Sequence, residues 1–247
     1  MAINDDLIEN YINNFFGYGN IHSNYWFVGL EEGGGKDKHE LINRVQTWKK
    51  RGQMRLEDCR DFHLQFGEKK WHRSNPYPQK TWSVYIRLFL KITNQDADIL
   101  NFQKNKFCRK DSDQCCIELR PIPQKNTATK EWPSKGISGL NFLSTQENYY
   151  DYCLKTLNER RLNFIRKQVQ DKNPKYVFFF GKEWEKHLPL QKWEKLSYGY
   201  KKKWKSSNFF ILKHPQFMTY SDHSDFQKEK KTNDYYDRVA NDIVGEI

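Results

Sequence analysis

The sequence has few cysteines and lacks the paired spacing typical of zinc and iron–sulfur sites. Its five cysteines are Cys59, Cys108, Cys115, Cys116 and Cys153. The number is odd and no Cys-x-x-Cys pair occurs, which argues against a disulfide framework and against a metal cluster. We therefore expect reduced thiols, and we expect neither a metal site nor a cofactor.

Long hydrophobic runs are also missing. No apolar run approaches the roughly 20 residues that a membrane-spanning helix needs. The N-terminal segment MAINDDLIENYINNFF is acidic and amphipathic, unlike a secretory signal peptide. Together with reduced thiols, these features predict a cytoplasmic protein with no membrane partner. The chain shows no internal repeat and no clear linker, so we expect a single domain over residues 1–247, and we expect a monomer.

The sequence has fewer acidic residues than basic ones. Lys and Arg total 42 and Asp and Glu total 31, which gives a formal net charge of +11. This balance favours an anionic partner, and nucleic acid is the commonest one. Aromatic residues make up 16% of the chain, and rings interleaved with Lys and Arg are suited to stacking on bases. The alternative is a protein whose basic side chains are merely solvated.

What the chain does have is a series of short apolar runs separated by helical patterns. The runs that we interpret as strands are NYWFVGL (24–30), CCIELRPIP (115–123), KYVFFFG (175–181) and NFFILKHPQF (208–217). Strands spaced by helices predict a parallel sheet, and runs that are apolar throughout predict helices on both faces. The sequence therefore predicts an α/β fold, a three-layer α/β/α arrangement around a central four-stranded parallel sheet.

Polar clusters follow three of these strands. They are Glu31-Glu32 with Gly33 to Gly35, Arg120-Pro121 with the loop to Asn126, and His214-Pro215-Gln216. Ligands of such sheets bind outside the carboxyl ends of the strands, and glycines let a ligand approach the backbone. The alternatives are that the glutamates cap a helix near Asp37, and that His214 is a buried histidine with satisfied hydrogen bonds.

The order of these motifs resembles the uracil-DNA glycosylase superfamily, most closely its thermostable bacterial and archaeal branch. GLEEG (29–33) stands where that branch has Gly-x-x-Pro-Gly, and Pro76-Tyr77 matches its Pro-Phe pair before an apolar helix. ELRPIPQKN (118–126) is similar to its strand ending in CRPP with a following Asn-Arg. PKYVFFFG (174–181) matches PKVIVALG, and His214-Pro215-Gln216 matches His-Pro-Ser or His-Pro-Ala. The resemblance spans roughly residues 25–225.

The resemblance implies a DNA glycosylase, which flips a nucleotide out of the duplex and hydrolyses its glycosidic bond. Glu31 would stabilise the positive charge on the sugar and activate water, with Glu32 as the fallback. His214 would donate a hydrogen bond to the departing base. The substrate would be uracil or a damaged or modified base, including a C5-enlarged pyrimidine of phage DNA, in repair or antiviral defence. The alternatives are a catalytically inactive nucleic-acid-binding or sensing module on the same fold and an enzyme acting on a small nucleotide.

The remaining expected site residues surround the base or contact the DNA. Base-pocket candidates are Gly29, Leu30, Gly33, Tyr77, Trp82, Gln114 and Asn126. DNA-contact candidates are Arg120, Lys125, Lys201, Lys202, Lys203, Lys205, Pro215, Gln216 and Phe217. Tyr77 and Trp82 suit a core position equally well, and a lysine run is often only a solvated loop.

The sequence also departs from the family pattern. The early Cys-x-x-Cys of the branch's iron–sulfur site is absent, which predicts that no cluster is bound. Gln114 or Cys115 falls where the family reads uracil with an Asn. Gly33 stands where the best-known uracil-specific members carry a Tyr that excludes C5 substituents, so the sequence predicts an open gate. Gln216 replaces the usual Ser of the last motif.

Overall fold

The computed structural model describes residues 3–124, 132, 135–215 and 225–245. Within these residues, one mixed sheet has the strand order β3-β1-β4-β2-β5-β8-β7-β6. The strands are β1 (Gly17–Gly19), β2 (Tyr25–Gly33), β3 (Leu56–Glu57), β4 (Gln114–Gln124), β5 (Tyr176–Phe180), β6 (Glu194–Leu196), β7 (Gly199–Trp204) and β8 (Ser207–Leu212). The predicted α/β class is confirmed, but the sheet has eight strands instead of four.

The four predicted strands form the middle of this sheet. Strands β4, β2, β5 and β8 are neighbours in that order and all run parallel. The flanking strands are short or antiparallel, since β1 pairs antiparallel with β4, and β7 pairs antiparallel with β8. The prediction is therefore right for the centre of the sheet and incomplete at both of its edges.

The β7–β8 hairpin shows why an edge strand was missed. Its segment, residues 198–208, has the lysine run of a solvated loop. In the structure the two strands are joined by a two-residue turn in which Lys205 has a φ of 53°. Such turns usually carry Asn-Gly or Asp-Gly, so the sequence gives no turn signal. Strand alternation then puts Tyr200, Lys202 and Trp204 on one face.

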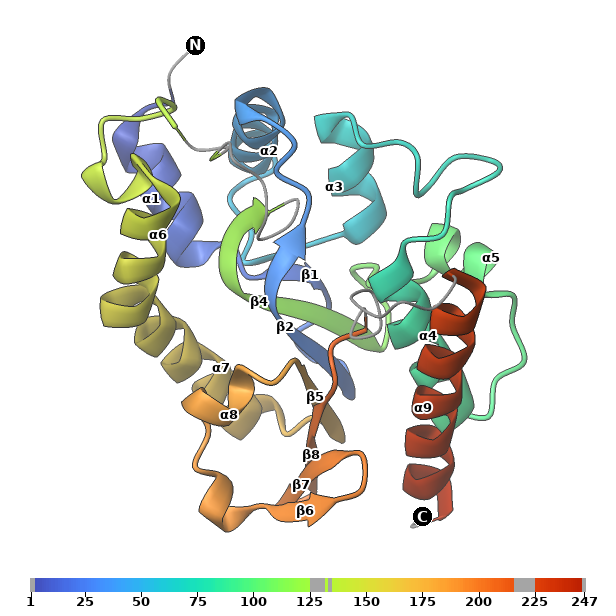
Figure 1. The fold of residues 1–247 in the computed structure, drawn as a ribbon. Helices are drawn as coiled ribbons and strands as arrows, with labels where there is room; N and C mark the ends of the chain where they lie inside the picture. Colours follow the sequence, from blue (N-terminus) through green and yellow to red (C-terminus); the bar gives the residue numbers. More distant parts are fainter. Residues whose placement is uncertain (1–2, 125–131, 133–134, 216–224, 246–247) are drawn as a thin grey trace.

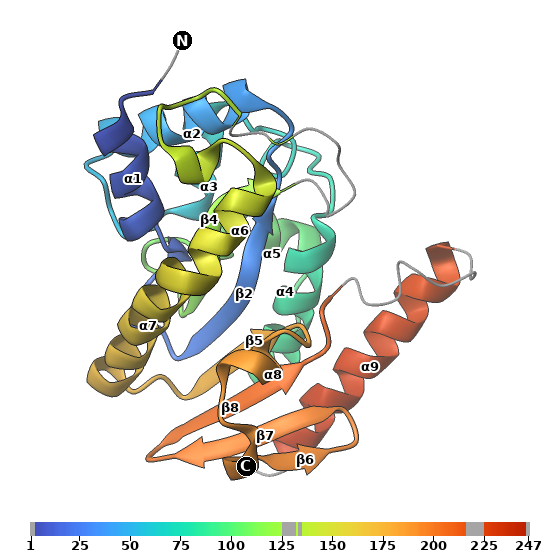
Figure 2. The same cartoon turned by 60° about the vertical axis from the view of Figure 1, so that its left-hand side comes forward.

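Helices lie on both sides of the sheet. They are α1 (Asp5–Asn14), α2 (Lys38–Lys50), α3 (Cys59–Phe66), α4 (Lys80–Ile92), α5 (Ile99–Asn105), α6 (Gln146–Tyr152), α7 (Asn158–Lys172), α8 (Trp184–His187) and α9 (Asp225–Gly245). Figure 1 shows α6 and α7 on one side and α4 and α9 on the other. In Figure 2, β7 and β6 form the edge of the sheet far from α1 and α2. None of the described helices is both long and apolar enough to cross a membrane.

Strand β5 explains how the two faces are covered. Phe178 and Phe180 belong to the hydrophobic cluster that contains the buried side chains of α4 and α9. Val177 and Phe179 belong to the second cluster, which contains the buried side chains of α7. Successive side chains of β5 point to opposite faces of the sheet. Each buried side chain contributes roughly 1.5–3 kcal/mol, so one apolar strand stabilises the packing of helices on both faces. The expectation that both faces are covered is confirmed.

Candidate functional site

Glu31 lies near the carboxyl end of β2, opposite Arg120 of β4. Its side chain is 19% exposed, and its Oε2 is 3.7 Å from Arg120 Nη1. The Tyr150 hydroxyl of α6 is 3.2 Å from both carboxylate oxygens. Burial raises the pKa of Glu31 above its ordinary value, against the opposing effects of Arg120 and Tyr150. Glu31 is therefore a partly accessible carboxyl group that takes up a proton more readily than a free glutamate does.

Arg120 lies between two carboxylates. Its guanidinium forms an ion pair with Glu183, which follows β5, while its other side faces Glu31. His187 Nε2 is 3.6 Å from Glu183 Oε1, and this histidine, together with the Arg120 charge, lowers the pKa of Glu183 to about 2. Arg120, a predicted DNA contact, is 5% exposed and is paired within the protein. It can orient Glu31 and stabilise its charge, whereas its burial leaves little surface for a phosphate.

Tyr150 connects Glu31 to two amide side chains. Its hydroxyl is 3.1 Å from Gln124 Oε1, and Gln146 Nε2 donates to the same oxygen at 2.9 Å. Burial and the charge of Glu31 raise the pKa of Tyr150 to about 12, so this tyrosine keeps its proton at neutral pH. The hydroxyl can donate to Glu31 or to Gln124, one at a time.

Sequence reasoning missed Tyr150 and Glu183. Glu183 could have been found, because GKEWEKH (181–187) is a polar cluster directly after a predicted strand. Tyr150 has no such signal, since it lies inside a helical pattern 119 residues away from Glu31. Only the packing of α6 beside β2 and β4 brings the two together.

Glu32 has entirely different surroundings. Its Oε2 is 2.7 Å from Arg44 Nη1 of α2 and 2.8 Å from the Tyr18 hydroxyl of β1, and its Oε1 is 3.5 Å from His63 Nε2 of α3. Burial alone would raise the pKa of Glu32, but Arg44 and His63 outweigh it and hold the value at about 2. Glu32 is therefore held in its ionised form by the ion pair with Arg44. It does not readily accept a proton, so it is less suited than Glu31 to the predicted catalytic role.

Neither glutamate caps a helix. Asp37 is the N-cap of α2, and its Oδ1 accepts hydrogen bonds from His39 N at 2.9 Å and Glu40 N at 3.0 Å. The capping interpretation of Glu31 and Glu32 is thus wrong, because Asp37 already serves that purpose.

The glycines around the glutamates differ in their roles. A Cβ at Gly29 would lie 2.2 Å from Glu118 Oε2, and one at Gly35, whose φ is +65°, would lie 2.1 Å from the Pro123 carbonyl oxygen. A side chain at Gly29 would require the buried Glu118 side chain to move, whereas Gly35 is required both by its positive φ and by the Pro123 backbone. At Gly33, no described atom lies within 4 Å of the added Cβ, so the space there is open.

Three predicted base-pocket residues have different outcomes. Trp82 is 6% exposed and packs on His63, with ring centroids 5.3 Å apart, so its core alternative holds and the stacking role is wrong. Gln114 is buried at the start of β4, at the amino-terminal edge of the parallel strands, and therefore cannot reach Glu31. Tyr77 is 56% exposed and stacks on the guanidinium of Arg73.

Leu30 and Pro215 occupy buried or half-buried positions beside the site. Leu30 is partly buried and packs against the cluster on the α7 face, close to Gly181 at the end of β5. Pro215 is buried, three residues after the last residue of β8. The predicted residues Asn126, Lys125, Gln216 and Phe217 lie outside the described residues.

His214 follows β8 on the same edge of the sheet as Glu31. The register pairs Val28 with Phe179 and Phe179 with Ile211. Glu31 lies three residues beyond the last β2–β5 pair and His214 two residues beyond the end of β8, and β2 and β8 are two strand spacings apart, or about 10 Å. The His214 side chain is exposed, so the buried-histidine alternative is wrong, but nearby protein atoms partly desolvate the ring and lower its pKa, which favours the neutral imidazole at pH 7.

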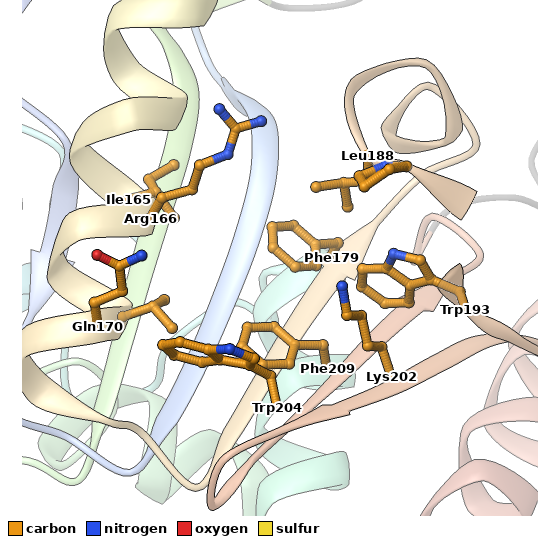
Figure 3. Close-up of a pocket in the computed structure, with 11 residues that line it drawn as sticks. Ile165, Arg166, Gln170, Phe179, Leu188, Trp193, Lys202, Trp204 and Phe209 are labelled. Atoms are coloured by element: carbon orange, nitrogen blue, oxygen red, sulfur yellow. The ribbon is translucent and has the colours of Figure 1, made fainter. Parts of the chain in front are cut away.

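The predicted lysine run lies on the β7–β8 hairpin and divides between two environments. Lys203 and Lys205 are exposed. Lys202 instead lines a cavity of about 380 Å³ between α7 and strands β5, β8 and β7, together with Trp193 and Trp204. Figure 3 shows the Lys202 amine beside the Trp193 ring, 6.0 Å from its centroid. Trp204 and Phe209 line the cavity below them. The prediction of one lysine surface is thus too simple.

Comparisons with known proteins return no relative of this chain. No family model matches it, and no curated protein or solved structure matches it. The resemblance to the uracil-DNA glycosylase superfamily therefore depends on the motifs alone, and the function is inferred from the site.

Proposed function

We propose that the protein is a DNA glycosylase that excises uracil or a modified base. The observation that supports the proposal is that Glu31 lies near the carboxyl end of β2 and His214 follows the carboxyl end of β8, two strands away in the parallel centre of the sheet. A gap of about 10 Å accommodates a flipped nucleoside, with the sugar near one side chain and the base near the other.

Glu31 has the properties that the sugar end of this reaction needs. Cleavage of the glycosidic bond leaves positive charge on the sugar, and a carboxylate nearby stabilises that charge and orients water. Arg120 keeps the ionised form available, while Tyr150 fixes the orientation of the carboxylate. Because burial raises the pKa of Glu31, the group can also accept the proton that the attacking water gives up.

His214 would act at the other end of the bond. The base departs as an anion, and an N–H aimed at its oxygen stabilises the developing charge. A neutral imidazole carries one N–H, which is enough for this purpose, and partial desolvation favours the neutral form. Open space beside Gly33 fits a base with a substituent at C5, as well as uracil.

DNA is proposed as the partner because the chain is strongly basic. The chain carries a net charge of +11, and the exposed Lys203 and Lys205 lie at the turn of the β7–β8 hairpin. This turn is at the amino-terminal end of β8, at the opposite edge of the sheet from His214. Phosphates are the expected counter-charges for these lysines, so DNA bound at the site would have to extend along β8 to reach them.

The proposal is tested on oligonucleotides, single-stranded and duplex, that carry one uracil or one C5-enlarged pyrimidine. We expect an abasic site at that position, detected by alkaline cleavage, from the wild-type protein and from the control variant Glu159→Gln, whose carboxylate is exposed on α7. We expect His214→Asn to leave the DNA intact under the same conditions. Intact DNA with the wild-type protein at every base would refute the proposal.

A second function is favoured by one observation, the cavity in Figure 3. Two tryptophans and two phenylalanines line this cavity with Lys202, and they are suited to stacking an unpaired base close to a phosphate. A nucleic-acid-binding module would retain single-stranded DNA in a mobility-shift assay, lose retention in Trp204→Ala, and release no base from any substrate.

A further inference from the structure

A cysteine and two histidines meet in the core beside α3. Cys59 begins α3, His63 follows one turn later, and His72 comes from the loop after the helix. One ligand atom from each residue lies within 4.8 Å of the others. All three side chains are at least 97% buried. This Cys59–His63–His72 cluster is separate from Glu31 and takes no part in the proposed reaction.

His72 is the member of the cluster whose buried ring nitrogens lack hydrogen-bond partners among the described residues. The nearby Lys104 backbone does not meet hydrogen-bond geometry. A buried polar group without a partner is unfavourable, whereas a neutral imidazole nitrogen is the form that binds metals.

His63 is already arranged as metal-bound histidines usually are. Its Nδ1 contacts the Cys59 carbonyl oxygen and lies 3.7 Å from Cys59 Sγ, and its Nε2 lies 3.5 Å from Glu32 Oε1. In the metal-free protein the proton on Nε2 faces this carboxylate, and a metal ion would take the place of that proton while Nδ1 donates to the carbonyl. Two ligand atoms on a tetrahedral zinc ion are separated by about 3.4 Å, given bond lengths near 2.05 Å. A cation between His63 Nε2 and Glu32 Oε1 would bind both.

We propose that Cys59, His63 and His72 bind a divalent transition metal, with zinc preferred. Imidazole and thiolate donors select zinc over the oxygen-binding cations. Glu32 Oε1 supplies a fourth ligand, because Arg44 and Tyr18 hold only the other carboxylate oxygen. On binding, the Cys59 thiol gives its proton to solvent and the thiolate sulfur bonds to the metal. The three ligand atoms lie within 4.8 Å of one another, and side-chain movements of about 1 Å would bring them to the roughly 3.4 Å that separates two zinc ligands.

The site would tie α3 and its following loop to the end of β2, directly beside the carboxylate that performs the proposed chemistry. The sequence pattern Cys-x₃-His-x₈-His has no paired cysteines, so a search for Cys-x-x-Cys does not find it. The expectation of no metal site depended on that search.

The test uses the full chain, stripped of metal and titrated with Co²⁺. We expect one equivalent to bind, with the absorption of tetrahedral cobalt and a sulfur-to-cobalt charge-transfer band, and Zn²⁺ to displace it. His72→Phe and Cys59→Ser should lose this binding by at least tenfold in affinity. The matched controls are Cys153→Ser, a buried cysteine outside the cluster, and His22→Asn, an exposed histidine; both should bind like the wild-type chain.

Two results would overturn the proposal. One is a folded wild-type chain that shows no charge-transfer band at stoichiometric Co²⁺, a measurement that stands even where a variant fails to fold. The other is His72→Phe with wild-type cobalt binding, which would make His72 only a buried core residue. Because binding is read without DNA, failure here leaves the proposed glycosylase function unaffected.

Discussion

Glu31 and Glu32 are adjacent in the sequence, yet the fold shifts their pKa values in opposite directions. Glu31 is 19% exposed and its pKa is raised by burial, with Arg120 shared between it and Glu183. Glu32 is 11% exposed and its pKa is held at about 2 by Arg44 and His63. Identical side chains on neighbouring positions are thus distinguished by what lies around them. The proposed reactive group is Glu31, which is partly exposed and has a raised pKa. Glu32, which is ion-paired with Arg44, contributes to the stability of the fold instead.

The largest expected difference between the two is catalytic. Glu31→Gln should lower single-turnover base excision by a factor on the order of 10²–10⁴, since it removes the charge and the proton acceptor together. His214→Asn should have an effect of the same order. The urea midpoint of Glu31→Gln should stay near that of the wild type. Undiminished excision in both variants would break the assignment of the site.

The next difference is in stability. Glu32→Gln removes the closest carboxylate from the buried Arg44 and leaves only Glu40, 3.6 Å away, so it should lower the free energy of unfolding by about 3–5 kcal/mol. Equilibrium urea unfolding measures this. The double variant Glu32→Leu/Arg44→Met removes both charges and should recover most of the loss. A Glu32→Gln variant as stable as the wild type would show that the ion pair contributes nothing.

The pH dependence of stability should have opposite signs for the two groups. A lowered pKa stabilises the fold above the ordinary value of 4.5, and this contribution of about 3 kcal/mol is lost as the pH falls towards 2. A raised pKa means that the folded state binds more protons, so the contribution of Glu31 improves as the pH falls through the range just above 4.5.

Urea midpoints between pH 7 and 2 separate these contributions. Compared with the wild type, Glu32→Gln should lose less stability on acidification below pH 4.5. Glu31→Gln should lose more than the wild type between neutral pH and 4.5, because it lacks the proton uptake. Parallel curves for all three proteins would contradict both pKa shifts.

A smaller difference concerns Gly33 and Gly35, two of the three glycines after the glutamates. Gly33→Ala should be tolerated, because the space around it is open and its φ is not positive, whereas Gly35→Ala should be clearly destabilising. Gly33→Tyr should then abolish the release of C5-enlarged pyrimidines while sparing uracil. Competition assays with both substrates measure this preference. Equal loss of every substrate in Gly33→Tyr would assign Gly33 to the turn and not to the base pocket.

The smallest expected effect is on DNA binding. Lys203→Gln and Lys205→Gln together should flatten the salt dependence of DNA affinity by roughly 0.9 in slope per lost phosphate contact. The cavity residue Lys202, as Lys202→Gln, is the matched comparison. An unchanged slope in the double variant would move the DNA away from the hairpin.

The sequence predicted the parts of the fold that depend on local patterns. Apolar runs identified β2, β4, β5 and β8, and their order predicted which edge holds the polar residues. It failed where the decisive contact is distant or the local signal is absent. Lys205 forms a turn without a glycine or asparagine, so the β7–β8 hairpin was not expected.

The candidate site was predictable to the same extent. Glu31 and His214 follow predicted strands, so their common edge could be inferred before the structure. Tyr150 and His72 could not be found in this way, because each joins its cluster only through packing between elements. Apart from the motif position, nothing in the sequence separates Glu31 from Glu32, since their partners Arg120 of β4 and Arg44 of α2 come from different distant elements.

The division of roles between the two glutamates is tested most directly by mass spectrometry of free bases. Wild-type, Glu31→Gln and Glu32→Gln proteins are each incubated with a panel of DNAs containing uracil and C5-modified pyrimidines, and yields are expressed per folded molecule. We predict that the wild type and Glu32→Gln release the same base, and that Glu31→Gln releases none in the same time. Release by Glu31→Gln at the wild-type rate, or no free base from any DNA with the wild type, would contradict the account.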